Sequence, residues 1–146
     1  MRKLVLGIGN FLLADEGVGV HVAQQLLTDD EMRDVDVYDV GTAVFDVLPV
    51  MAEAEQVVVV DAMKGGRPPG TIYRLSIDDC AHSGPLGSVH GFDMKSVLYL
   101  VDREDLPEVT VIGVEPGLVS WSTDLSGAVA DALPEIVTAV KKEIWS

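Results

Sequence analysis

The first apolar segment, residues 3–8, is followed by Gly9 and then by two adjacent acids, Asp15 and Glu16. From Val18 onward, apolar side chains recur at helical spacing. A continuously apolar strand that leads through a glycine turn into a helix is typical of a parallel sheet with helices on both faces. Ligands of such open sheets bind at the carboxyl ends of the strands, so we expect Asp15 and Glu16 at that edge.

The rest of the chain continues to alternate strand-like and helix-like segments. We predict one domain, residues 1–146, of the α/β class: a three-layer α/β/α sandwich with a five-stranded, mostly parallel sheet. The Pro68-Pro69-Gly70 turn leads directly into its strand, which we therefore expect to be the antiparallel one. The predicted strands are 3–8, 36–40, 56–61, 71–77 and 109–114, and the predicted helices are one from Val18, one at 43–54, one from Phe92 and one from about Ser126.

Charge and composition exclude several classes of protein. The net charge of −14 argues against binding to nucleic acid or to anionic membranes. The longest apolar runs are too short to span a bilayer, and we expect no secretory signal. Cys80 is the only cysteine, so no intrachain disulfide can form. Together these features favour a cytoplasmic protein.

The glycine turn after the first strand has a second interpretation. Gly7-x-Gly9 is typical of the start of a dinucleotide-binding loop, but Leu12 stands where the third glycine is needed. A phosphate group would also meet Asp15 and Glu16 where it requires bare amide donors. A nucleotide-dependent enzyme of small molecules is therefore disfavoured.

Two carboxylates and one histidine are the strongest candidates for chemistry. We expect Asp15 to cap the helix that starts near Gly17, which leaves Glu16 facing the crevice. Asp61 ends the valine-rich strand, so it would lie at the same edge of the sheet. His90 lies in a loop that is expected to reach this edge. One imidazole with two carboxylates can bind a divalent transition metal and leave coordination positions open, but the spacing alone fits simple structural roles as well.

Five blocks of the sequence resemble, in the same order, those of the [NiFe]-hydrogenase maturation endopeptidases. Each block is short, but their order along nearly the whole chain makes the resemblance specific. The blocks are Gly7-Ile8-Gly9-Asn10 with Asp15-Glu16-Gly17-Val18-Gly19, Asp39-Val40-Gly41-Thr42, Val60-Asp61-Ala62 with Pro69-Gly70, Ser88-Val89-His90, and Gly113-Val114-Glu115-Pro116 with Leu125-Ser126.

The resemblance implies a substrate and a set of site residues. Such proteins remove a short C-terminal extension from the hydrogenase large-subunit precursor after nickel has been inserted. The metal-contacting and catalytic residues of the family correspond to Glu16, Asp61 and His90 here, although some relatives have aspartate in place of Glu16. The nickel would be supplied by the substrate, and other divalent metals can occupy such a site. The resemblance leaves open whether a carboxylate also acts as general base.

Two further expectations concern partners. A non-catalytic module that senses metal or assists hydrogenase assembly could use the same three residues, and it is the alternative to a protease. We expect the isolated chain to be a monomer, since no segment is left over to form an obvious interface. The strong acidity is consistent with simple solubility as much as with a high-salt cytoplasm or a basic partner, and one hypothesis is that it helps to dock a basic patch on the large subunit or its tail.

Overall fold

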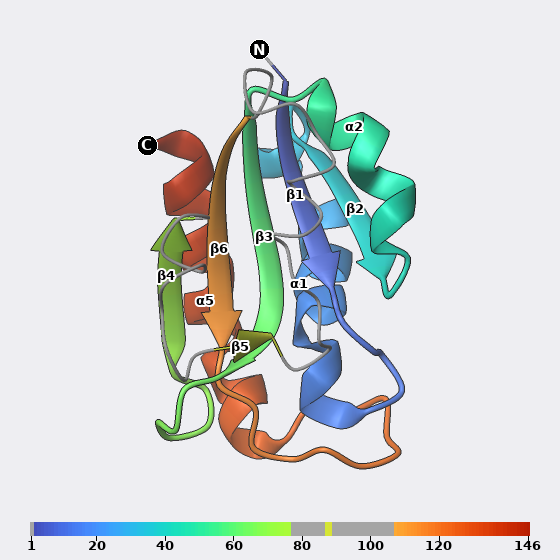
Figure 1. Ribbon diagram of the computed structural model, residues 1–146. Coiled ribbons are helices and arrows are strands. Elements are labelled where there is room, and N and C mark those ends of the chain that lie inside the picture. The colour runs from blue at the N-terminus through green and yellow to red at the C-terminus, as the bar shows by residue number, and fades with distance from the viewer. Residues whose placement is uncertain (1, 77–86, 89–106) are drawn as a thin grey trace.

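Five strands form the central sheet, in the order β2-β1-β3-β6-β4 (Figure 1). The computed structural model describes residues 2–76, 87–88 and 107–146. Strands β1, β2, β3 and β6 are parallel, and β4 is antiparallel to β6. The bounds are β1 Lys3–Ile8, β2 Asp36–Gly41, β3 Gln56–Lys64, β4 Ile72–Ser76 and β6 Glu108–Val114. The mixed sheet with one antiparallel edge strand confirms the predicted fold class.

Helices cover both faces of the sheet. One face carries α1 (Val18–Leu27) and α5 (Gly127–Trp145), and the other carries the 3-10 helix η3 (Val44–Val47) with α2 (Leu48–Ala52). Two further 3-10 helices are η1 (Ala14–Gly17) and η2 (Asp30–Met32). The single helix predicted at 43–54 is thus two shorter helices, with Pro49 in the first turn of α2, where its missing N–H costs nothing.

The alternation of side chains along β1 and β3 builds two separate cores. Leu4, Leu6 and Val57 face η3 and α2. Val5 and Val58 face α1 and α5. Because β3 lies in the middle of the sheet, its four valines, 57–60, are buried on both sides. Each such valine stabilises the fold by roughly 1.5–3 kcal/mol relative to an exposed one.

Two glycines allow α1 and η1 to approach the sheet closely. A Cβ atom on Gly19 would overlap the carbonyl oxygens of Val60 and Ile8, and one on Gly9 would overlap the carbonyl oxygen of Glu16. Only glycine fits where two backbones come this near. The glycine-rich opening of the chain therefore packs η1 and the start of α1 onto the carboxyl ends of β1 and β3.

The loop after β1 and the loop between β6 and α5 lie side by side at the carboxyl end of the parallel strands (Figure 1, bottom). Both termini lie at the opposite end of the sheet. Within the described ranges, the structure contains no helix that is long and apolar enough to cross a membrane. The helix predicted from Phe92 falls outside the described residues.

Candidate functional site

Asp61 lies at the carboxyl end of the central sheet, but it does not end its strand as the sequence suggested. The pairing of β1 with β3 ends where Gly7 meets Val60. Asp61 is therefore the first residue of β3 past the part that β1 covers. Strand β3 continues to Lys64 because two other strands pair with its last residues. Strand β6 pairs with β3 as far as Ala62, and the two-residue strand β5 (Gly87–Ser88) pairs with the two residues that follow. The side chain of Asp61 is buried, and its Oδ1 accepts a hydrogen bond of 2.8 Å from the backbone N–H of Ala62.

Glu16 lies on η1, which packs against β3, and the residue is buried, with 9% of its surface exposed. Its backbone is held at both ends. The Glu16 N–H donates to the carbonyl of Leu13 (3.2 Å), and the Glu16 carbonyl accepts from the N–H of Asn10 (3.1 Å). The structure therefore brings the segments that carry Glu16 and Asp61 together at one edge of the sheet, as predicted.

Asp15 does not cap the helix that follows it, so that prediction is wrong. Neither η1 nor α1 has a side-chain cap. The fully buried Asp15 carboxylate instead accepts hydrogen bonds of 2.7–2.8 Å from the N–H groups of Gly117, Leu118 and Ser126, and from the hydroxyl of Ser126. Burial alone would raise the pKa of Asp15, but these hydrogen bonds outweigh it and lower the pKa. Asp15 is thus a structural anion that fixes the loop between β6 and α5 next to Glu16.

The backbone of the segment after β1 is strained at Ala14. Ala14, directly before the two acids, has a φ of 51°, a left-handed conformation that is uncommon for residues other than glycine. Its N–H donates to the carbonyl of Ser122 (2.8 Å), and the N–H of Ser122 donates to the carbonyl of Leu12 (3.0 Å). This pairing helps to offset a backbone strain of about 1–3 kcal/mol directly before the two acids.

His90, the third predicted site residue, lies outside the described residues, as do His82 and Cys80. Among the residues that the structure describes, no three His, Cys, Asp or Glu side chains are grouped so that they could hold a metal ion. The described part of the candidate site is therefore a pair of buried carboxylates, Glu16 and Asp61. Carboxylate oxygens are suited to a divalent cation or to a polarised water, and they need an additional ligand to complete a metal site.

Sequence reasoning missed the structural role of a further buried carboxylate, Glu115. Its Oε1 accepts hydrogen bonds from the Tyr73 hydroxyl (2.7 Å) and from the N–H groups of Gly65 (2.7 Å) and Arg67 (3.2 Å). Burial would raise the pKa of Glu115, and these hydrogen bonds reverse the shift and lower it. Burial and the Glu115 contact raise the pKa of Tyr73. The signal was present, because Glu115 directly follows a buried strand, as Asp61 follows the segment 57–60.

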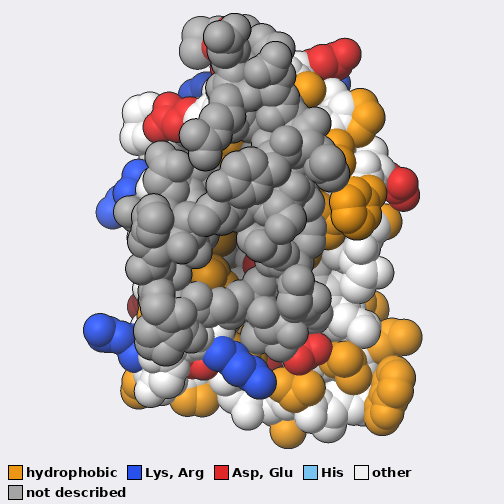
Figure 2. Space-filling view, viewed as in Figure 1, with side chains coloured by type: hydrophobic (Ala, Val, Ile, Leu, Met, Phe, Trp, Pro, Cys, Tyr) orange, Lys and Arg blue, Asp and Glu red, His pale blue; other side chains and the backbone are white. Residues whose placement is uncertain are grey.

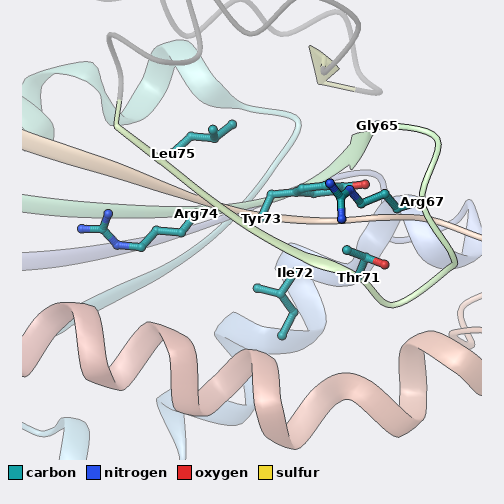
Figure 3. A pocket seen from close by; sticks show the side chains of 7 residues that line it. All are labelled: Gly65, Arg67, Thr71, Ile72, Tyr73, Arg74 and Leu75. Carbon is teal, nitrogen blue, oxygen red and sulfur yellow. The ribbon is translucent and has the colours of Figure 1, made fainter.

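Two surface cavities flank this end of the sheet. One, of about 390 Å³, runs along the edge strand β4, where Tyr73 and Arg67 lie beside each other and Ile72 points toward α5 (Figure 3). The other, of about 220 Å³, lies between the loop after β1 and the end of β2. Its lining residues are Gly9, Asn10, Phe11, Leu12, Val20, Gln24, Asp39, Gly41 and Thr42. The second cavity adjoins the loop that leads to Glu16, so it is the better placed to receive part of a substrate.

Comparisons with known proteins agree on one family. The model of the hydrogenase maturation protease family matches residues 20–143. The chain is 42% identical to a hydrogenase expression/formation protein HupD of Rhodobacter capsulatus, over 98% of this chain and 71% of that protein. It is 39% identical to the hydrogenase 2 maturation protease of Escherichia coli, over 97% and 92% of the two chains. The solved structure of the hydrogenase maturating endopeptidase HybD from E. coli superposes with a TM-score of 0.82 at 28% identity, covering 96% of this chain and 90% of that one.

Proposed function

This chain belongs to the hydrogenase maturation protease family, and we propose that it removes a C-terminal extension from the nickel-loaded large-subunit precursor of a [NiFe] hydrogenase. Relatives bear the names protease and endopeptidase, so the chain is a peptide-bond hydrolase. We further propose that nickel in the precursor is what the enzyme recognises. The substrate, not the protease, supplies that ion.

One observation supports this proposal most directly: Glu16 and Asp61 are both buried on adjoining segments, η1 and β3, at the carboxyl edge of the sheet. Carboxylate oxygens are suited to binding a divalent cation. Two of them on adjoining segments at one edge of the sheet could engage a nickel ion that the precursor holds there. Recognition of the substrate would then depend on whether its nickel is in place.

The roles of the residues follow from the chemistry of their side chains. We expect the carboxylates of Glu16 and Asp61 and the imidazole of His90 to occupy open positions on the precursor's nickel and so to fix the scissile peptide beside it. A divalent ion can polarise a carbonyl group or lower the pKa of a bound water. Either carboxylate, once oriented, can accept the proton of the attacking water. Asp15, committed to four hydrogen bonds, is not available for this role.

The test is incubation of the protein with nickel-loaded precursor, followed by intact-mass measurement. We expect the wild-type protein to reduce the mass of the precursor by that of a C-terminal peptide. The isosteric variants Glu16→Gln and Asp61→Asn should lower the rate at least about 100-fold, as expected when a group that acts on the reacting atoms is lost. The matched controls Glu135→Gln and Asp131→Asn, which alter exposed carboxylates of α5, should process normally. Stable binding of the precursor by the wild-type protein without loss of mass would contradict the proposal and favour a sensing or chaperone module.

A further inference from the structure

Four large apolar side chains are exposed together beside the candidate site. Trp121 is 81% exposed, Leu12 53%, and Leu118 and Val119 47% each. They lie on the two loops that meet at the carboxyl edge of the sheet, and Figure 2 shows hydrophobic side chains gathered at that lower end of the molecule. We call Leu12, Leu118, Val119 and Trp121 the apolar surface. Among the described residues, the other large apolar side chains that are exposed lie apart from one another, on α1, η3 and α5. They are Leu27, Phe45 and Trp145.

The backbone beneath the apolar surface is firmly held. Leu12 accepts a hydrogen bond from the N–H of Ser122, and Leu118 accepts one from the N–H of Asp15 (3.1 Å). The N–H of Leu118 in turn donates to the Asp15 carboxylate (2.8 Å). The backbone of the two loops is thus joined beneath Leu12 and Leu118. A backbone that is already held loses little conformational entropy when a partner covers it.

The charge pattern restricts what that partner can be. Residues 9–14 and 116–123 contain no charged side chain, although 23% of the residues in the chain are charged and the net charge is −14. A second copy of this chain would bring two strongly acidic molecules together, so electrostatic repulsion opposes self-association. An uncharged, apolar segment of another protein fits the apolar surface, and a strongly acidic one does not.

The position of the apolar surface indicates which protein supplies that segment. Leu12 precedes Glu16 by four positions, and Asp15, next to Glu16, is bonded to Leu118. A folded protein that delivers a peptide to Glu16 would therefore come close to these two loops. We propose that the apolar surface docks an uncharged, apolar segment of the large-subunit precursor, next to the scissile bond of the precursor. This inference rests on the proposed function. Trp121 is the central anchor of the apolar surface, since buried tryptophans contribute disproportionately to interface affinity.

The experiment separates docking from chemistry with matched substitutions. Leu118→Ser and Trp121→Ser change the apolar surface, whereas Leu27→Ser and Trp145→Ser make the same changes at the opposite end of the molecule. The Kd for nickel-loaded precursor is measured for each in a Glu16→Gln, Asp61→Asn background, and KM and kcat are measured in the wild-type background. Circular dichroism and thermal melting check that every variant is folded.

We expect Trp121→Ser to raise both Kd and KM about 30-fold and Leu118→Ser to raise them about 10-fold, with kcat changed less than about twofold. The two control variants should stay within about twofold of the wild type. Unchanged Kd values for both surface variants, or a loss confined to kcat, would overturn the proposal. So would sedimentation showing a wild-type dimer that Trp121→Ser dissociates, because a second copy would then be the occupant. A wild-type protein that binds precursor without cleaving it would refute the proposed function yet still allow the docking comparison.

Discussion

The carboxylate of Asp15 receives hydrogen bonds from both the backbone N–H and the hydroxyl of Ser126, 111 positions further along the chain. Ser126 is the N-cap residue of α5, directly before the helix begins at Gly127. The same carboxylate binds the N–H groups of Gly117 and Leu118. One buried anion thus joins the loop after β1, the loop after β6 and the start of α5 at the edge where Glu16 lies.

Removal of the Asp15 carboxylate should be strongly destabilising. Asp15→Ala leaves three backbone N–H groups and one hydroxyl without their acceptor in a buried position, and we expect the free energy of unfolding to fall by about 2–4 kcal/mol. Urea denaturation measures the change. The control is Asp124→Ala, which alters an exposed aspartate near the same loop and should change stability by less than about 0.5 kcal/mol. Equal effects of the two substitutions would contradict the structural role of Asp15.

Stability should fall in acid because buried carboxylates have lowered pKa values. The pKa is lowered for Asp15 and Glu115 by hydrogen bonds that outweigh burial, and for Glu143 chiefly by its hydrogen bond with Arg74. A group whose pKa is lower in the folded state stabilises the fold fully above its ordinary pKa, and that contribution is lost as the pH falls through the folded value. The ordinary values are 3.8 for Asp and 4.5 for Glu.

We therefore expect these three groups to contribute a constant amount to the free energy of unfolding from pH 7 to about 5.5, and a decreasing amount below about pH 4.5. Urea titrations at a series of pH values measure the slope. Glu115→Gln should make the acid slope shallower, because one of the contributing groups no longer titrates. A slope in this variant that matches the wild type would show that Glu115 is not linked to folding.

Gly19 should tolerate no side chain. A Cβ atom there would overlap the backbone carbonyls of Val60 and Ile8, so Gly19→Ala must push α1 and η1 away from the sheet. We expect a loss of more than about 3 kcal/mol in unfolding free energy and, in any folded fraction, slower processing because Glu16 is displaced. Gly127→Ala is the matched control. A Cβ at Gly127 meets nothing within 4 Å, and alanine favours the helix there, so this variant should be neutral or up to about 1 kcal/mol more stable.

The edge strand β4 is attached to α5 by a two-pronged ion pair. Arg74 donates to both carboxylate oxygens of Glu143 at 2.7 and 2.8 Å, and the Thr110 hydroxyl donates to the same carboxylate. The side chain of Glu143 is only 11% exposed, whereas that of Arg74 is 64% exposed. A double-mutant cycle with Arg74→Ala and Glu143→Gln should give a coupling energy of about 1 kcal/mol, since solvent screens the exposed partner. Additive effects would mean that the pair does not stabilise the sheet edge.

Local patterns in the sequence were sufficient to predict the architecture. Continuous apolar segments located β1, β3 and β6, and helical periodicity located α1 and most of the buried stripe of α5. The apolar spacing of α1 continues to Leu27, but α1 ends there and Leu27 is exposed. The prediction that Asp61 ends its strand was wrong. The last residues of β3 are held by pairing with β6 and β5, which are far away in the sequence.

The sequence indicated the location of the candidate residues only through the edge of the sheet that they share. Because the carboxyl edge of a parallel sheet gathers such residues, Glu16 and Asp61 were expected near each other, and the segments that carry them do adjoin. Their part in the reaction stays a prediction. The role of Glu115 was missed, although it directly follows β6. The role of Asp15 depends on Gly117, Leu118 and Ser126, and no local pattern connects it to them. No local pattern indicated the place of His21 either. Its ring lies 5.1 Å from that of Phe11, and its Nε2 is buried without a hydrogen-bond partner among the described residues.

The measurement that tests the central claim most directly is the rate of peptide release from nickel-loaded and nickel-free precursor, followed by intact mass in parallel reactions. If Glu16 and Asp61 act on the substrate's nickel, the wild-type protein should cleave the loaded precursor at least about 100-fold faster than the nickel-free one. The Glu16→Gln variant should lose most of that preference, while Glu135→Gln keeps it. Equal cleavage of the two precursors by the wild-type protein, or an undiminished preference in Glu16→Gln, would contradict the account.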